Sequence, residues 1–307
     1  MNSLFGDKEL LYYTPRLEAL CKVSFPVDEP EMSEFESAFL CGLIREKKPK
    51  KIVEIGVAAG GTTAIILECL SQLDLNKSAE LYSIDCSELY YRGTGEKSGY
   101  LAEEYKRVSG WEGRHSVFLG KYFPEVVAEI GNEIDFVVLD TAHCLPGELL
   151  DFLAVFSFLK PHACVVLHDI ILNHIENPVA IATQLLFDVV VADKCLTEDA
   201  SREHGCSNIG AFVINDDSAK YIANVFHALS VSWYYLPDRN VYEQYLKLFE
   251  KYYSPDLLRY ARTIYELQFN TCEKFRHELY GWKSSKSYKI GKMVTRFPRW
   301  IKDLFVK

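Results

Sequence analysis

The chain has 307 residues, of which 49% are hydrophobic and 25% charged, and its formal net charge at pH 7 is −9. This composition is typical of a folded globular protein with one large domain or two modest ones, and the negative charge argues against nucleic acid as a general partner. No apolar run approaches the roughly 18 residues that span a bilayer, and the first residues do not resemble a signal peptide. We therefore expect a cytoplasmic protein. The nine cysteines form no CxxC pair, which indicates free thiols rather than disulfides or a zinc site.

The predicted elements alternate between helices and short β-branched strands from residue 31 onward. Residues 31–47 place apolar side chains on one helical stripe, and Pro49 ends that helix. The strand KIVEIGV, a glycine turn and the helix TTAIILECLSQL follow, and the same order recurs further along the chain. The other predicted strands are ELYSID, HSVFLG, IDFVVLD, ACVVLHD, FDVVVAD and NIGAFVIN, and the other predicted helices are YLAEEYKRVSG, EVVAEIG and GELLDFLAVFSFL.

This alternation predicts an α/β fold with a doubly wound, mainly parallel sheet, in which ligands bind beyond the carboxyl ends of the strands. The sheet has seven strands if FDVVVAD and NIGAFVIN, joined by the loop KCLTEDASREHGCS, pair as an antiparallel edge. We assign residues 1–217 to this domain with its amino-terminal helices. Residues 218–307 are predicted as a helical extension from YIANVFHAL, VYEQYLKLFEKYY and LLRYARTIYELQ, and the pattern leaves open whether it packs on the sheet or forms a separate lobe.

The turn VEIGVAAGGTT after the first strand fits two nucleotide-binding patterns. Both need glycines because the backbone must bend sharply and approach a ligand closely. The dinucleotide pattern G-x-G-x-x-G requires a glycine where this chain has Ala58. The pattern for S-adenosylmethionine (SAM), an acidic residue followed by x-Gly and then x-x-x-Gly, is met by Glu54, Gly56 and Gly60. Asp85, at the end of the next strand, can hold ribose hydroxyls in either case.

Two downstream segments favour SAM. DFVVLDTAH ends a predicted strand at Asp140 and continues to His143, and LKPHACVVLHDI ends the next strand at His168 and Asp169. With these segments the chain resembles the class I SAM-dependent methyltransferases over roughly residues 30–215. Within that class it is similar to the branch of small-molecule and glycan O-methyltransferases that includes the macrocin and cephalosporin-hydroxylase-like methyltransferases.

The resemblance implies a Rossmann-like methyltransferase fold and a set of site residues. The implied cofactor-binding residues are Glu54, Gly56, Gly60, Gly61, Asp85 and Asp140. Related O-methyltransferases hold a divalent metal such as Mg²⁺ on carboxylates at two strand ends, which here are Asp140 and Asp169. The usual third oxygen ligand is missing, because His168 precedes Asp169 and Ile170 follows it. The alternative is catalysis by Asp140 with His143 and His168, in which a histidine takes the proton from the acceptor hydroxyl.

The predicted function is the SAM-dependent transfer of a methyl group to a hydroxyl of a sugar, a glycan precursor or another small molecule, as in polysaccharide biosynthesis. Two alternatives stay open. One is N-methylation, which needs no metal. The other is a catalytically silent methyltransferase-like scaffold, since the chain has His162 and Ala163 where the resembled branch usually has two glycines.

The end of the chain carries a separate prediction. From Leu279 onward there are eight Lys and Arg and one Asp, and after Pro298 a helix would place Trp300 with other apolar side chains on one face. Such a basic amphipathic tail predicts peripheral contact with the anionic inner face of a membrane, unless its aromatic residues pack on the catalytic domain. Similar basic tails end some bacterial cell-surface polysaccharide enzymes, which is why a glycan precursor heads the expected acceptors. The oligomeric state stays open.

Overall fold

The computed structural model describes residues 11–13, 25–27, 31–197, 207–289 and 292. The chain divides into two compact units, Met1–Ala261 and Arg262–Lys307, and the break lies within the long helix α12 (Pro255–Ser284). The sequence pattern instead placed a division after residue 217, so the helices between these two points belong to the same compact unit as the sheet. The described part of the second unit is helical. Most of the basic tail falls outside the described residues.

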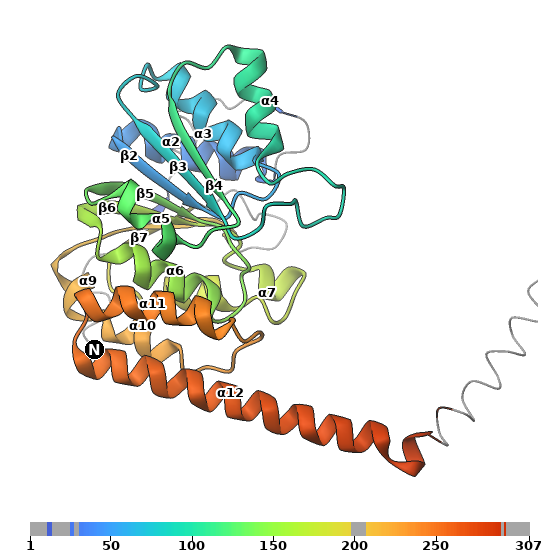
Figure 1. Cartoon of the computed structure of the whole chain (residues 1–307). Helices are drawn as coiled ribbons and strands as arrows, with labels where there is room; N and C mark the ends of the chain where they lie inside the picture. The colour runs from blue at the N-terminus through green and yellow to red at the C-terminus, as the bar shows by residue number, and fades with distance from the viewer. Residues whose placement is uncertain (1–10, 14–24, 28–30, 198–206, 290–291, 293–307) are drawn as a thin grey trace, which may run out of the picture. The chain divides into compact units, whose positions relative to one another are not determined.

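The first unit is built on one eight-stranded sheet with the order β1-β7-β8-β6-β5-β2-β3-β4 (Figure 1). Only β8 runs antiparallel to its neighbours; the other neighbouring strands are parallel. The predicted doubly wound, mainly parallel seven-stranded sheet is confirmed, and β1 adds an eighth strand at one edge. The strands are β1 (Leu11–Tyr13), β2 (Lys51–Ile55), β3 (Glu80–Asp85), β4 (Arg114–Leu119), β5 (Ile134–Leu139), β6 (Leu159–Leu167), β7 (Asp193–Thr197) and β8 (Gly210–Val213).

Helices pack in two groups on the sheet (Figure 1). The first group, whose neighbours contact one another in turn, is α2 (Glu34–Lys47), α3 (Gly61–Gln72) and α4 (Tyr100–Ser109). The second group is α5 (Phe123–Ile130), α6 (Gly147–Phe156), α8 (Ala182–Val189), α10 (Ala223–Ala228) and α11 (Arg239–Tyr252). Two short helices, α7 (Leu172–Ile175) and α9 (Asp216–Lys220), lie in the connections.

The order of the strands reverses between β2 and β5. From β2 the chain adds β3 and β4 on one side, and it then returns to place β5 on the other side of β2. The carboxyl ends of β2 and β5 therefore form a topological switch point. In open α/β sheets the ligand crevice lies at this point.

One predicted strand is wrong over most of its length. The segment FDVVVAD begins inside helix α8, and the strand β7 starts only at Asp193 and continues into residues predicted as loop. A short apolar run is compatible with either a buried helix or a buried strand. Here the preceding residues ATQLL already form the helix, and the apolar run continues it. NIGAFVIN contains β8, which is antiparallel as predicted.

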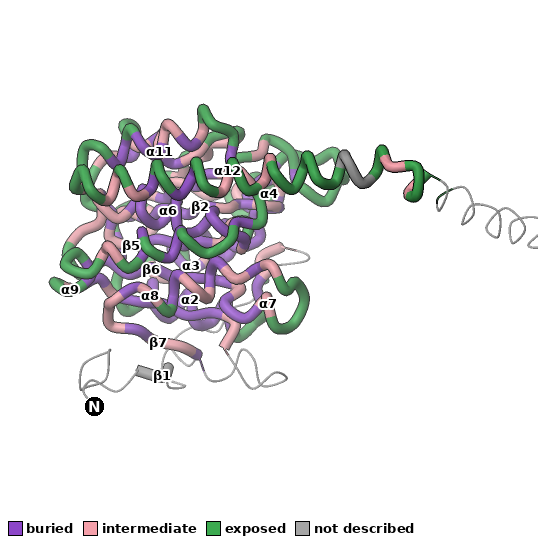
Figure 2. The backbone as a smooth tube through the Cα atoms, turned by 90° about the horizontal axis from the view of Figure 1, so that it is seen from below, coloured by how far each residue is buried: buried purple, intermediate pink, exposed green. Residues whose placement is uncertain are grey.

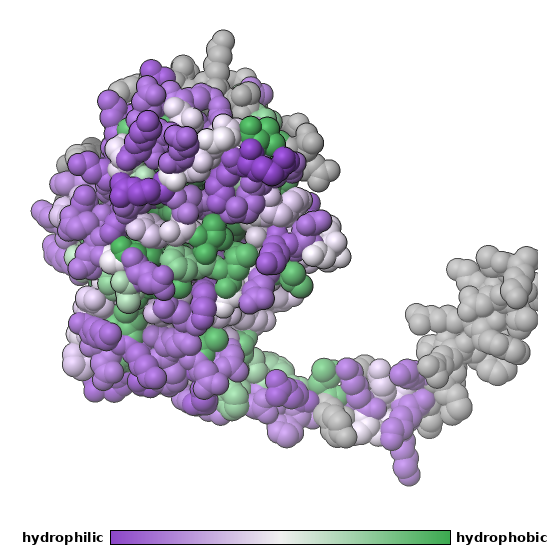
Figure 3. Space-filling view, turned by 45° about the horizontal axis from the view of Figure 1, so that its top comes forward, coloured by the Kyte–Doolittle hydropathy of each residue, from purple (hydrophilic) through white to green (hydrophobic). Residues whose placement is uncertain are grey.

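The centre of the sheet is the core of the first unit. Strands β2, β5 and β6 are buried along most of their length, as Figure 2 shows in purple. Helices on both faces explain why these strands are continuously apolar in sequence. On the face seen in Figure 3, hydrophobic side chains gather in the middle with hydrophilic ones around them. The seven cysteines within the described residues are free thiols. None of the helices in the described part of the chain is both long and apolar enough to cross a membrane.

Candidate active site

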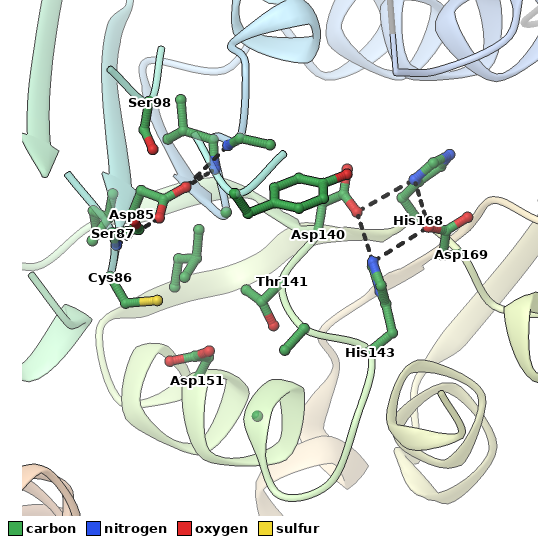
Figure 4. Close-up of a pocket in the computed structure, with 18 of the residues that line it drawn as sticks. Asp85, Cys86, Ser87, Ser98, Asp140, Thr141, His143, Asp151, His168 and Asp169 are labelled. Atoms are coloured by element: carbon green, nitrogen blue, oxygen red, sulfur yellow. Dashed lines mark hydrogen bonds and ion pairs between the residues drawn. The ribbon is translucent and has the colours of Figure 1, made fainter. Parts of the chain in front are cut away.

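A cavity of about 1240 Å³ opens at the carboxyl ends of β2, β3, β5 and β6. Residues at all four strand ends line it, and Figure 4 shows many of their side chains pointing toward the same space. Segments distant in sequence complete the wall of the cavity. They contribute Glu31 and Glu36 near the start of α2, Tyr235 before α11, and Tyr245 on α11. The volume exceeds that of a typical pocket for one small ligand, so a cofactor and a second small molecule fit together.

The glycine turn brings the ends of β2 and β5 into close contact. Gly56 has a φ of +94°, and a Cβ at this position would lie 1.9 Å from the backbone oxygen of Asp140. Gly60 has a φ of +92°, and a Cβ there would lie 2.8 Å from Cα of Gly99. Any other residue at these two positions would displace the neighbouring backbone. Gly61 begins helix α3, and neither it nor Gly60 is among the residues that line the cavity.

Asp85 holds the turn from the neighbouring strand. Its Oδ2 accepts hydrogen bonds from the backbone N–H groups of Val57 at 3.0 Å and Ala58 at 2.9 Å, and its Oδ1 accepts one from Ser87 at 2.8 Å. Asp85 also lines the cavity. Because each carboxylate oxygen has two lone pairs, these bonds leave capacity for hydroxyl groups of a ligand.

Glu54 lies beneath the turn and is not among the residues that line the cavity. Its side chain is fully buried, and Oε2 accepts hydrogen bonds from the hydroxyls of Thr63 at 2.7 Å and Ser83 at 2.6 Å. Burial raises the pKa of Glu54 to about 8 against the lowering effect of these hydrogen bonds. Glu54 therefore joins β2 to α3 and β3, and its expected contact with the ammonium group of SAM stays a prediction.

Asp140, His143 and Asp169 converge on another part of the cavity (Figure 4). Nε2 of His143 lies 3.6 Å from Oδ1 of Asp140 and 3.3 Å from Oδ2 of Asp169. One possible ligand atom from each residue lies within 4.8 Å of the others. His143 and Asp169 have φ angles of 55° and 60°, in the left-handed region that costs a non-glycine residue about 1 kcal/mol or more. Backbone strain of this kind is typical of functional sites, where the surrounding structure maintains it.

His168 lies between two carboxylates behind this trio. Its Nδ1 is 3.3 Å from Oδ1 of Asp140, and its Nε2 is 3.4 Å from Oε1 of Glu36. Burial alone would lower the pKa of His168, but the charges of Asp140 and its other acidic neighbours raise it well above the usual value. Burial would likewise raise the pKa of Glu36, yet His168 lowers it to about 2. These charges favour the protonated form of His168, which lies against the carboxylates of Asp140 and Glu36.

Glu148 supports His143 from the other side. The carboxylate of Glu148 accepts a hydrogen bond from the backbone N–H of His143, and its Oε1 lies 3.4 Å from Nδ1 of the same residue. Glu148 is fully buried on α6, and burial raises its pKa. The hydroxyl of Thr183 is also 3.4 Å from Nδ1. A histidine whose Nδ1 faces a carboxylate presents its Nε2 to a proton or a metal ion.

Several of these neighbours were not identified from the sequence. Nδ2 of Asn208, just before β8, donates hydrogen bonds to Oδ1 of Asp169 at 2.9 Å and to Oε1 of Glu36 at 3.0 Å. Glu36 and Asn208 are separated by most of the domain, and no local pattern links them. Glu148 did offer a signal, because an acidic residue within the apolar segment GELLDFLAVF has to be buried or paired.

Comparison with known proteins finds a family model that matches one segment of the chain. Residues 53–170 match the family model described as a methyltransferase domain. The matched residues include the glycine turn, Asp85 and the Asp140, His143 and Asp169 trio. This match agrees with the methyltransferase resemblance of the sequence motifs, and the sheet has the Rossmann-like arrangement that the resemblance implied.

Solved structures of methyltransferases are also similar to this chain. The SAH-bound methyltransferase PaMTH1 from Podospora anserina is 14% identical, with 60% of this chain and 80% of that chain covered and a TM-score of 0.45. A putative O-methyltransferase from Klebsiella pneumoniae is 15% identical, with 62% and 84% covered and a TM-score of 0.45. An O-methyltransferase from Bacillus cereus in complex with SAH is 16% identical, with 61% and 84% covered and a TM-score of 0.43. No curated protein matches the sequence.

Proposed function

We propose that this protein is a SAM-dependent methyltransferase that transfers the methyl group of SAM to a hydroxyl of a small molecule, and that the acceptor is a sugar or a glycan precursor. The observation that carries the proposal is the convergence of Asp140, His143 and Asp169 in the same cavity as Asp85 and the glycine turn. SAM lies over the turn with its ribose hydroxyls on Asp85. Its methyl group is directed toward the trio, where the acceptor hydroxyl binds.

The trio deals with the main chemical difficulty of O-methylation, which is the high pKa of an aliphatic hydroxyl. His143 takes the hydroxyl proton on Nε2 as the methyl group moves. Its Nδ1 faces the carboxylate of Glu148 and the hydroxyl of Thr183, which leaves Nε2 as the nitrogen available to the acceptor. Asp169 and Asp140 stabilise the imidazolium that forms, at 3.3 and 3.6 Å from Nε2. Methyl transfer itself then requires in-line positioning of the oxygen and the methyl group.

The same three residues also fit a divalent metal ion. Around an octahedral ion with bonds of about 2.1 Å, ligand atoms stand about 3 to 4.2 Å apart, and Nε2 of His143 lies within this range of both carboxylates, at 3.6 and 3.3 Å. Asp140, His143 and Asp169 would hold the ion, and a bound ion lowers the pKa of a coordinated hydroxyl. His143 would then replace the third oxygen ligand that the sequence lacks. A mixed carboxylate and imidazole set suits Mn²⁺, Fe²⁺ or Zn²⁺ as well as Mg²⁺.

The acceptor class and the membrane contact rest on the basic tail from Leu279 onward. An acceptor carried on a lipid would be reached by an enzyme whose tail binds the anionic membrane surface. Glycan precursors are the class of hydroxylated acceptor that is held in this way, so we place the reaction in polysaccharide biosynthesis at the inner face of the membrane.

Formation of S-adenosylhomocysteine from SAM with a pool of sugar and phenol acceptors tests the function. Turnover that EDTA abolishes and a divalent ion restores identifies the metal route. Turnover that EDTA leaves unchanged, and that rises with pH as the base loses its proton, identifies the histidine route. Full activity of both His143→Ala and His168→Ala together with indifference to EDTA would leave the proposed chemistry without a catalyst and would refute it. Turnover with amines alone would indicate N-methylation, and binding of SAM without turnover of any acceptor would indicate a scaffold.

A further inference from the structure

Helix α12 has an apolar stripe that is buried near its beginning and exposed farther along. Ala261 and Ile264 lie on one face of the helix and are buried. Counted in steps of three or four residues, the same face continues through Cys272, Phe275 and Leu279. Phe275 is 63% exposed and Leu279 is 48% exposed. Figure 2 shows this part of α12 mainly in green, the colour of exposed residues.

An exposed apolar stripe is unfavourable for a helix in water. Isolated helices are only marginally stable, and most helices in proteins are stabilised by the packing of their apolar face. Exposed apolar patches therefore mark sites of interaction more often than single exposed residues do. The stripe on α12 calls for a partner, and its spacing and flanking charges indicate which kind.

The spacing of the stripe is that of a two-stranded coiled coil. Cys272, Phe275 and Leu279 are separated by three and then four residues, as are positions a and d of the heptad repeat. The sequence continues this spacing with Trp282. Residues 271–284 thus span two heptads, about 21 Å of helix, with Cys272 and Leu279 at position a and Phe275 at position d.

The charged residues beside the stripe fit a second copy of the same helix. In this register Glu278 occupies position g on one side of the stripe, and Lys283 occupies position e on the other. In a parallel coiled coil, position g of one helix faces position e of the next heptad of its partner, so Glu278 lies opposite Lys283 of a second copy, twice by symmetry. In an antiparallel pair the positions e would face each other, and both Arg276 and Lys283 are basic. Charge complementarity therefore favours a parallel pair.

A membrane surface fits this face less well. Helices that lie on an anionic membrane carry Lys and Arg on their polar face. Between residues 266 and 283, acidic and basic side chains are equal in number, and the acidic Glu278 borders the stripe. In this respect α12 differs from the basic tail that follows it.

We propose that residues 271–284 of α12 pair in parallel and in register with the same residues of a second copy of this chain, so that this face is a dimer interface. Phe275 and Leu279 of both copies form its apolar centre, and Glu278 pairs with Lys283 of the second copy. The parallel orientation brings the two carboxyl-terminal tails to the same end of the pair, where two linked contacts with a membrane bind more tightly than one. The pairing itself does not depend on the proposed reaction.

Sedimentation velocity of the full chain over a range of concentrations tests the interface. The wild-type protein is expected to dimerise reversibly. Phe275→Glu and Leu279→Glu should each raise the dissociation constant by at least about 10-fold, because each places a charge in the apolar centre of the pair. Phe275→Leu, which keeps an apolar side chain at position d, is the matched control and should stay dimeric. Circular dichroism checks that every variant keeps its helices.

Charge reversal tests the orientation of the two helices. Glu278→Lys and Lys283→Glu each set like charges opposite each other at two symmetric positions, and each should weaken dimerisation about fivefold or more. The double variant restores opposite charges and should return the dissociation constant to within about twofold of the wild-type value.

Cys272 provides an independent readout, because position a of one helix faces position a of the other in a parallel pair in register. Diamide, which oxidises two thiols to a disulfide, should link two wild-type chains covalently. Cys272→Ser should abolish this link. Cys86→Ser, which removes an exposed free thiol elsewhere in the chain, should not.

Dimerisation unchanged in both Phe275→Glu and Leu279→Glu, no recovery in the double charge variant, or a disulfide link that persists in Cys272→Ser would overturn the proposal. A wild-type protein that is monomeric at every concentration would also overturn it. In that case a Phe275→Glu variant that no longer sediments with anionic vesicles would identify a membrane as the occupant of the stripe. A Phe275→Glu variant with a lower free energy of unfolding would instead identify the rest of the same chain.

Discussion

Gly56→Ala is the substitution whose effect the structure defines most closely. An alanine Cβ at this position would lie 1.9 Å from the backbone oxygen of Asp140 and 2.6 Å from its carbonyl carbon, and the φ of +94° is unfavourable for any side chain. The unfavourable φ costs about 1–2 kcal/mol. Forcing an extra carbon into a packed region costs about 1–3 kcal/mol more. The expected loss in free energy of unfolding is therefore about 2–5 kcal/mol, a large part of the roughly 5–15 kcal/mol of a typical domain.

Gly110→Ala is the matched control. Gly110 ends α4 with a φ of +67°, and nothing lies within 4 Å of the place its Cβ would take. This variant should lose only the backbone part, about 1–2 kcal/mol. Urea denaturation followed by circular dichroism measures both values. Equal losses for the two variants would refute the argument that close contact with Asp140 requires a glycine at position 56.

The same pair of variants separates stability from catalysis. A Cβ on Gly56 displaces the backbone that carries Asp140, so we expect turnover at a temperature where both variants are folded to fall by on the order of 100-fold in Gly56→Ala, as for a misplacement of about 1 Å. Gly110→Ala should turn over at the wild-type rate, since α4 ends away from the residues that line the cavity. Normal turnover in folded Gly56→Ala would contradict a catalytic role for the position of Asp140.

Three further predictions concern other parts of the chain. Asp85→Ala should weaken binding of SAM by about 1.5–3 kcal/mol, because it loses charged hydrogen bonds to the ribose; calorimetry that gives the wild-type affinity would rule out the proposed cofactor position. Glu54→Gln should stabilise the fold increasingly as the pH rises from about 5 to 8. The pKa of Glu54 is raised to about 8 in the folded protein, so the stability that protonated Glu54 contributes is fully present below its unfolded pKa and is lost as the pH rises through its folded pKa. Parallel curves of unfolding free energy against pH for the two proteins would disprove this. The full chain should sediment with anionic vesicles and a chain cut after Lys283 should not, because each Lys or Arg adds about 1 kcal/mol; equal partitioning would remove the membrane claim and the main reason for preferring a glycan acceptor.

The sequence predicted the sheet because its central strands carry an unambiguous signal. IDFVVLD and ACVVLHD are apolar on both faces, which is typical of strands covered by helices on both sides, and both became buried parallel strands. The edge was harder to predict. The run FDVVVAD continues a helix, and a three-residue strand such as β1 has too few residues to show a period.

The site was predictable only in part, because some of its residues lie on helices and not at strand ends. The residues at strand ends, such as Asp85 and Asp140, could be grouped because parallel strands end at the same edge of the sheet. The residues that give them their properties come from helices. Glu36 on α2 lies against His168, Glu148 on α6 lies against His143, and Asp151 faces the cavity from the same α6. Which helical side chain reaches a strand end depends on packing, and a single sequence does not contain that information in a local pattern.

Asp140 contacts both the glycine turn and the two histidines of the cavity. Its backbone lies against Gly56 in the cofactor turn, and its carboxylate lies between His168 and His143. Burial would raise the pKa of Asp140, but the two histidines lower it below the usual value, so the carboxylate stays ionised. In the proposed mechanism, the position of the methyl donor and the charge at the acceptor hydroxyl thus depend on the same short segment. A side chain at position 56 would displace the backbone of Asp140, and under this proposal it would move both reacting groups at once.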